Sequence, residues 1–151
     1  MKTIIIDTIH LALYKRLEAK GFECIDASKM DDIKVREILS DADGLVLRSR
    51  MTLNKQFIDD YPNLKFIGRV GAGLEHIDVD YAKSKGVEVF SSPEGNRQAV
   101  AEHALGSLLT LFNRIHTSNA EVREGKWIRK ANEGVELRGK TIGIIGFGNT
   151  G

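Results

Sequence analysis

The sequence predicts an α/β fold built on a parallel sheet with helices on both faces. Three observations support this fold class. Short β-branched runs alternate with helical patterns from residue 3 to residue 91. Two of the runs, GLVLR and LKFIG, are almost continuously apolar, as strands covered on both faces are. Gly21 and Gly86 each follow a lysine at the end of a helical pattern, where a left-handed cap favours glycine.

The expected elements follow in order along the chain. β-branched and aliphatic runs predict strands at residues 3–7, 22–26, 44–48, 64–70, 87–91 and 141–145. Helical patterns fill the gaps between the first five strands, at residues 10–21, 31–42, 54–63 and 79–86. The first of these helices is amphipathic from Lys15 onward, and Asp78 is expected to cap the last one.

A boundary is expected at SSPEGN, residues 91–96, which collects turn-forming residues in one place. The stretch QAVAEHALGSLLTLFNRI follows it, and the apolar residues between Ala99 and Ile115 nearly encircle the helix axis. Such a helix has to be buried on most sides, so it is expected to pack against a second domain, a partner subunit or both. A polar arm around Trp127 then leads to the strand at 141–145.

Composition excludes several function classes. The 151 residues carry 22 Lys and Arg against 21 Asp and Glu, a net charge of +1 that gives no sign of nucleic-acid binding. No apolar stretch is long enough to span a bilayer, and Asp7 and His10 interrupt the apolar amino terminus. Cys24 is the single cysteine, which favours a reducing, cytoplasmic location. The four histidines lack metal-ligand spacing, so no metal site is expected.

The closing stretch GKTIGIIGFGNTG contains Gly146, Gly148 and Gly151 in the spacing G-x-G-x-x-G, directly after an apolar strand. In a dinucleotide site the first glycine makes the tight turn, the second lets the pyrophosphate approach and the third allows helix packing. The alternative is an ordinary turn from a strand to a helix.

Two further loops follow predicted strands, at the sheet edge where α/β proteins bind ligands. In RVGAG, residues 69–73, glycines can direct backbone N–H groups at an anion, and Arg69 adds a guanidinium. The alternative is a tight turn with a solvated arginine. In RSRMT, residues 48–52, Arg48 and Ser49 are expected to converge with Arg69, while Arg50 is assigned to solvent. His76 lies close by and is given a structural role.

Taken together, these stretches resemble the D-isomer-specific 2-hydroxyacid dehydrogenases, most closely the D-3-phosphoglycerate dehydrogenase branch. The resemblance rests on LKFIGRVGAGLEHIDVDYAKSKGVEVFSSPEGNRQAVAEHALG, on RSRMT and on VREGKWIRKANEGVELRGKTIGIIGFGNTG, and so covers nearly the whole chain. It implies a flavodoxin-like substrate domain at residues 1–96. Residues 97–151 would then hold the crossing helix and the first strand of a truncated Rossmann domain for NAD.

The resemblance also implies roles for individual residues. The loop Val70–Gly73 would hold the substrate carboxylate, and Ala72 would also touch NAD. Arg48 and Arg69 would bind the distal phosphate, and Asn96 would lie beside the reacting centre. The pyrophosphate turn would be lined by Gly146, Phe147, Gly148, Asn149, Thr150 and Gly151, and the substrate-binding set would be Arg48, Ser49, Arg69, Val70, Gly71, Gly73 and Asn96.

The activity implied is hydride transfer between NAD and a small D-2-hydroxy acid, 3-phosphoglycerate in serine biosynthesis, by a homodimer formed through helix 99–115. The catalytic Arg, Glu and His of the family belong to a later part of the cofactor domain, so the present chain is expected to be an inactive fragment. Two alternatives remain open. One is an NAD-binding regulatory protein that resembles a corepressor, and the other is a free-standing flavodoxin-like domain with a remnant tail.

Overall fold

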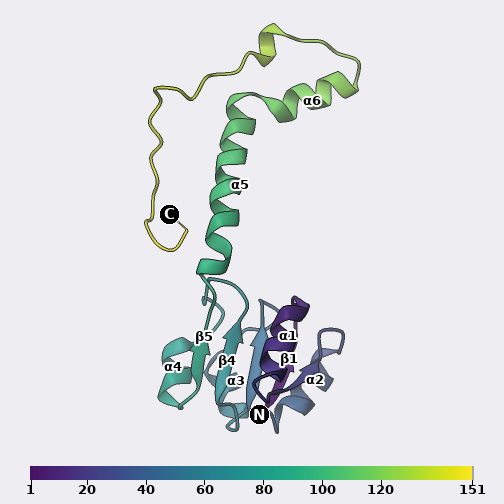
Figure 1. The fold of residues 1–151 in the computed structure, drawn as a ribbon, viewed down its shortest axis with the longest axis vertical. Coiled ribbons are helices and arrows are strands. Elements are labelled where there is room, and N and C mark those ends of the chain that lie inside the picture. Colours follow the sequence, from purple (N-terminus) through teal and green to yellow (C-terminus); the bar gives the residue numbers. More distant parts are fainter. Residues whose placement is uncertain (151) are drawn as a thin grey trace. The chain divides into compact units, whose positions relative to one another are not determined.

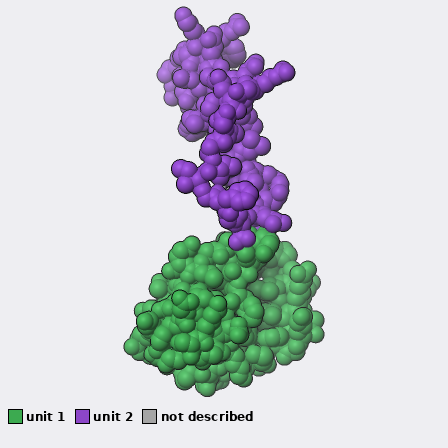
Figure 2. Space-filling view, turned by 90° about the vertical axis from the view of Figure 1, so that its left-hand side faces the viewer, with its two compact units in different colours: residues 1–95 green, residues 96–151 purple. Residues whose placement is uncertain are grey.

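A computed structural model describes residues 1–150 of the chain (Figure 1). The residues form two compact units, one from Met1 to Gly95 and one that begins at Asn96 (Figure 2). The first unit contains the whole sheet, and the second is helical at its start.

The first unit is built on a five-stranded parallel sheet with the strand order β2-β1-β3-β4-β5. This is the flavodoxin-like order, in which the direction of strand addition reverses between β1 and β3. The expected α/β fold with a parallel sheet is therefore confirmed. The strands are β1 (Lys2–Ile5), β2 (Glu23–Asp26), β3 (Gly44–Leu47), β4 (Phe66–Arg69) and β5 (Glu88–Phe90).

Four helices connect these strands, each begun by a side-chain cap. The caps accept hydrogen bonds from backbone N–H groups of the first turn, which otherwise have no intrahelical partner. Asp78 caps the last helix by accepting from the N–H of Tyr81, as the sequence predicts. The helices and their caps are α1 (Leu11–Glu18, His10), α2 (Asp32–Leu39, Asp31), α3 (Lys55–Asp60, Asn54) and α4 (Val79–Ser84, Asp78).

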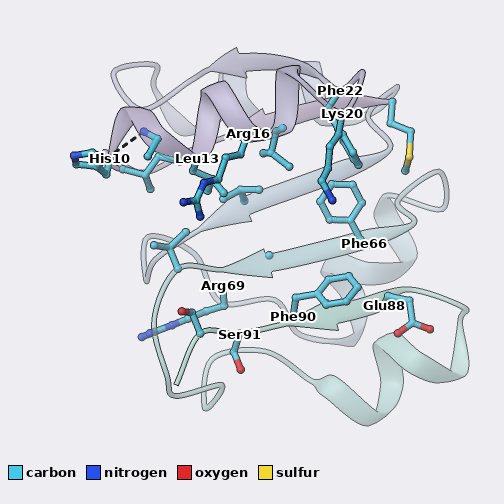
Figure 3. A pocket seen from close by; sticks show the side chains of 18 of the residues that line it. His10, Leu13, Arg16, Lys20, Phe22, Phe66, Arg69, Glu88, Phe90 and Ser91 are labelled. Carbon is cyan, nitrogen blue, oxygen red and sulfur yellow. Dashed lines mark hydrogen bonds between the residues drawn. The ribbon is translucent and has the colours of Figure 1, made fainter. Parts of the chain in front are cut away.

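The two faces of the sheet are covered unequally. Alternate strand residues such as Ile4, Leu45 and Ile67 are buried in one cluster with residues of α2, α3 and α4. The opposite face carries Val46 and Phe90, and α1 is the helix that lies on it (Figure 3). Phe90 is 57% exposed as a result. The continuous apolar character of the strands predicts that both faces of the sheet are covered. Residues 1–150 cover one face with α2, α3 and α4, and they cover the other only in part, with α1.

The second unit contains α5 (Glu94–Phe112, whose first residues belong to the first unit) and α6 (Ile115–Arg123). A short 3-10 turn follows at Lys130–Asn132. The expected long helix is present, but it begins within the turn-forming stretch 91–96. None of its residues is buried among the described part of the chain. An apolar helix surface of this extent needs other groups to pack against.

One expectation about the second unit is wrong, because residues 141–145 do not form a strand. The polar arm expected at residues 121–140 begins in the last turn of α6. Ile144 and Ile145 are 71% and 105% exposed. A strand exists only as a member of a hydrogen-bonded ladder, and no described residue offers a ladder to this apolar segment.

Candidate anion site at the carboxyl edge of the sheet

The loops after β3 and β4 lie side by side at the carboxyl edge of the sheet. Leu47 is in register with Arg69, and the N–H of Val70 donates to the carbonyl of Leu47 at 2.8 Å. Farther along, Leu53 pairs with Ile77 in a parallel bridge, and the N–H of Leu53 donates to the carbonyl of His76 at 2.7 Å. The expected proximity of the two loops is confirmed, and their backbones are tied together at two points.

The loop after β3 encloses a carboxylate that belongs to the protein. Oδ2 of Asp7 accepts hydrogen bonds from three successive backbone N–H groups, those of Arg48 at 2.6 Å, Ser49 at 3.2 Å and Arg50 at 3.3 Å. Successive N–H groups that converge in this way form a nest for an anion. The side chains of Arg48 and Ser49 are left exposed, and none of the hydrogen bonds or ion pairs within residues 1–150 involves them.

The assignment of Arg50 to solvent is wrong. Its guanidinium donates to the carbonyls of Ile6 at 2.9 Å and Ala27 at 3.2 Å, and to that of Met30. It also pairs with Asp32 at 2.8 Å. The expectation assumed an extended chain with alternating side chains, but residues 48–51 are bent. Arg50 thus connects the ends of β1 and β2 to the first turn of α2.

The loop after β4 is crowded by charged side chains. Gly71 has a φ of 151°, and a Cβ at this position would overlap Nη1 of Arg69, because the guanidinium lies over the glycine. Nε of Arg69 is buried and has no hydrogen-bond partner among the described residues. A Cβ at Gly73 would similarly overlap the carboxylate of Glu75.

The backbone donors of this loop are partly committed. The N–H of Val70 donates to Leu47, and that of Gly71 donates to the carbonyl of Arg69 at 3.0 Å. The N–H groups of Ala72 and Gly73 donate no hydrogen bond within residues 1–150. The carbonyl of Gly71 accepts from the N–H of Ser92 at 2.8 Å, which ties the loop to the end of β5. The donors open to a ligand are therefore Ala72 and Gly73, beside the guanidinium of Arg69.

Charge is divided along this edge of the sheet. Carboxylates stand at the ends of β1 and β2, where hydrogen bonds from Ser28 hold the pKa of Asp26 below its usual value. Burial, followed by the charge of Asp26, raises the pKa of Tyr14 nearby. The ends of β3 and β4 instead carry the guanidinium groups of Arg48 and Arg69. An anionic ligand is therefore attracted to the β3–β4 side of the edge.

The remaining residues singled out in the sequence lie in the second unit or serve structure. Asn96 is exposed in the first turn of α5. Residues Phe147, Gly148, Asn149 and Thr150 are exposed in an irregular segment, where Gly146 has a φ of 97°. Gly151 lies outside the described residues. His76 contributes its carbonyl to the pairing of the two loops.

A groove of about 920 Å³ lies on the open face of the sheet, between α1 and the strands β3 to β5 (Figure 3). Its floor includes Phe66 and Gly68, and Phe22 meets Phe66 edge to face with ring centroids 5.8 Å apart. Arg16 of α1 and Lys20, in the turn after α1, stand on its rim. The groove is apolar within, and its charged lining comprises cations such as Arg16 and Lys20 together with the carboxylate of Glu88.

Sequence reasoning missed Asp7, Arg50 and Glu75 as parts of this region. Asp7 carried one usable signal, since it is a carboxylate directly after the apolar run of the first strand. Within residues 1–150, no three His, Cys, Asp or Glu residues lie together in a way that would hold a metal ion. Likewise, none of the helices described is both long and apolar enough to cross a membrane.

Comparison with known proteins identifies relatives of the whole chain. Residues 3–144 match the family model described as D-isomer specific 2-hydroxyacid dehydrogenase, catalytic domain. A hydroxypyruvate reductase of Thermotoga maritima is 39% identical over 127 residues, which cover 84% of this chain and 42% of the relative. A D-3-phosphoglycerate dehydrogenase of Haemophilus influenzae is 35% identical over 153 residues, which cover 100% of this chain and 37% of the relative.

Solved structures give the same result for the fold. An NAD-dependent formate dehydrogenase from Staphylococcus aureus, solved in complex with NAD, superposes with a TM-score of 0.82 at 27% identity. The match covers 99% of this chain and 50% of that protein. The chain thus spans half or less of the length of the relatives it matches.

Proposed function

The chain belongs to the D-isomer-specific 2-hydroxyacid dehydrogenases, and we propose that it is the amino-terminal part of an enzyme that transfers hydride between NAD and 3-phosphoglycerate. The observation that carries the proposal is the presence of an arginine at each of two adjacent strand ends. Arg48 follows β3, and Arg69 ends β4 beside the open N–H groups of Ala72 and Gly73.

The chemistry of the substrate matches this arrangement. A phosphorylated three-carbon hydroxy acid carries an anionic group at each end. The N–H groups of Ala72 and Gly73 would bind the carboxylate, and the guanidinium groups of Arg48 and Arg69 would bind the phosphate, with Ser49 donating from its hydroxyl. Asn96 would complete the site from the start of α5. A shorter hydroxy acid without a phosphate leaves the two guanidinium groups without an anion.

NAD supplies the hydride acceptor when it is bound. The residues at the end of the chain fit a pyrophosphate turn in one respect, because Gly146 has the positive φ that a tight glycine turn requires. Gly148, with nothing within 4 Å of a Cβ built on it, leaves space for a phosphate to approach. Phe147, Asn149, Thr150 and Gly151 would line the same turn.

Several parts of the enzyme would lie outside this chain. In the family that the chain resembles, the general base and the cation that orients the carboxylate belong to the later part of the cofactor domain. Residues 1–151 alone are therefore proposed to bind the substrate without catalysing its oxidation. The returning part of a longer chain would cover the groove beside α1, because parallel sheets are covered on both faces. Helix α5, which forms residues 99–112 of the expected helix 99–115, would pair in a homodimer, and the enzyme would work in the cytoplasm in serine biosynthesis.

The test uses the complete polypeptide and follows NAD reduction at 340 nm. We expect oxidation of D-3-phosphoglycerate, and a KM for it that rises on Arg69→Gln or Arg48→Gln while the KM for D-glycerate changes little. Lys83→Gln is the control, because Lys83 is an exposed cation on α4, away from the strand ends. Equal effects of all three variants would contradict the phosphate site. NAD binding without turnover of any 2-hydroxy acid would instead support the regulatory alternative.

A further inference from the structure

Asp7 accepts hydrogen bonds from the backbone of the loop that carries Arg48 and Ser49. It follows β1, and the strand order places β1 beside β3 at the point where strand addition reverses. In open α/β sheets this point is the usual place for a ligand. Here the N–H groups of residues 48–50 converge there on Oδ2 of Asp7, at 2.6, 3.2 and 3.3 Å.

A nest of three amides is an anion site, and the protein fills this one with its own carboxylate. The loop is also fixed at its far end, since the guanidinium of Arg50 donates to the carbonyls of Ile6 and Ala27. Arg48 and Ser49 lie between these two anchors. Because their side chains are exposed and make no hydrogen bond within residues 1–150, the backbone is the part of the structure that sets where these side chains begin.

We propose that Asp7 is a positioning residue, which takes the place of a bound anion in the amide nest of residues 48–50 and so orients Arg48 and Ser49 toward the substrate's anionic group. The part that concerns Arg48 and Ser49 rests on the proposed function, whereas the filled nest does not. A second consequence follows from the charge. With the nest occupied, the substrate anion is confined to the side chains of Arg48, Ser49 and Arg69 and to the loop after β4.

The first experiment tests the nest itself and needs no catalysis. The Asp7→Ala variant of the 151-residue chain is labelled with ¹⁵N and titrated with acetate, a carboxylate probe of the size that the vacated nest admits. We expect saturable shifts of the amides of residues 48–50 in the variant and none in the unaltered chain. Asp41→Ala is the matched control, because Asp41 is an exposed aspartate paired with Lys2 and its loss leaves the nest filled.

Two results would overturn the inference: equal acetate shifts in the variant and the unaltered chain, or a folded variant whose amides 48–50 ignore acetate. If Asp7→Ala does not fold, Asp7→Asn decides, because it keeps the shape and one acceptor oxygen but removes the charge. Its amides 48–50 should then move upfield as the hydrogen bonds weaken. Amide positions identical to those of the unaltered chain would overturn the inference equally.

The second experiment tests positioning in the complete enzyme. We expect Asp7→Ala to raise the KM for D-3-phosphoglycerate by about tenfold, with a change in kcat of less than about twofold, and acetate to restore part of the loss. A fall in kcat at constant KM, or no change in either, would show that Asp7 does not position the anion site. If the unaltered enzyme oxidises no hydroxy acid, the proposed function fails, while the amide titration still decides whether Asp7 fills the nest.

Discussion

The substitution Gly71→Ala tests the loop after β4 in the simplest way. At this position φ is 151°, a conformation that residues with a Cβ rarely adopt, and the new methyl group would overlap Nη1 of Arg69. The backbone strain of a non-glycine residue in such a region is roughly 1–3 kcal/mol. The overlap adds little, because the guanidinium stands at the end of a flexible side chain and is able to rotate away.

We therefore expect Gly71→Ala to lower the free energy of unfolding by about 1–3 kcal/mol, or Tm by about 4–8 °C for each kcal/mol. Urea unfolding should be followed by far-UV circular dichroism, because the single Trp127 lies in the second unit and does not report on the sheet. Adding Arg69→Ala should recover less than about 0.5 kcal/mol, since removing the guanidinium does not relieve backbone strain.

Gly68→Ala is the matched control. Gly68 lies in β4, three residues before Gly71, and a Cβ there would be 3.4 Å from Cγ2 of Val46, an ordinary contact. Its unfolding free energy should be unchanged or raised by up to about 1 kcal/mol, because alanine restricts the unfolded chain. If Gly71→Ala is no more destabilising than Gly68→Ala, the strained loop does not exist. If Arg69→Ala restores full stability, the cause is crowding and not strain.

Three further predictions concern other parts of the chain. Arg50→Lys should lower the unfolding free energy by about 1–3 kcal/mol in urea titrations, because an ammonium group has no planar fork to reach three carbonyls. A variant as stable as the unaltered chain would show that the hydrogen bonds of Arg50 to these carbonyls do not stabilise the fold. A hydrogen bond from Lys65 lowers the pKa of Asp43 below its ordinary value of 3.8. The ionised Asp43 therefore stabilises the folded protein fully above the ordinary pKa, and this stabilisation is lost as pH falls through the lower pKa of the folded state. The stability deficit of Asp43→Asn should therefore shrink below about pH 4, and a deficit that is constant with pH would refute this. Because Leu105 is 54% exposed on α5, residues 1–151 should self-associate in sedimentation equilibrium and Leu105→Gln should weaken the association; a monomer at high concentration would refute this.

The elements of the first unit were predictable because their signals are local. An apolar run followed by a turn, or an aspartate before a helical pattern, acts through neighbours in the sequence, as Asp78 does when it caps α4. The start of α6 lacks such a signal. Its N-cap position is Arg114, which has a left-handed φ of 50° and makes no side-chain cap hydrogen bond.

The site could be predicted only in outline, because its details depend on which strands are neighbours. The glycines and arginines at the ends of β3 and β4 indicate two loops that the strand register places side by side. The roles of Asp7 and Arg50, however, depend on the order β2-β1-β3, which brings the ends of the first three strands together. The strand predicted at residues 141–145 is absent because a strand also depends on which segments are its neighbours. Its sequence is that of a strand, but pairing is a property of two segments and not of one.

The division of charge along the sheet edge also explains why a carboxylate stands so close to a proposed anion site. Asp7 would repel a substrate anion if its charge were free, but three N–H dipoles surround Oδ2 and compensate much of its field. In return, those dipoles are no longer available to attract solvent ions. The attraction of this edge for an anion then comes mainly from Arg48 and Arg69. Their side chains are able to move with a ligand, whereas backbone amides are fixed. A site of this kind selects for an anion that both guanidinium groups reach, which favours a phosphate over a single carboxylate.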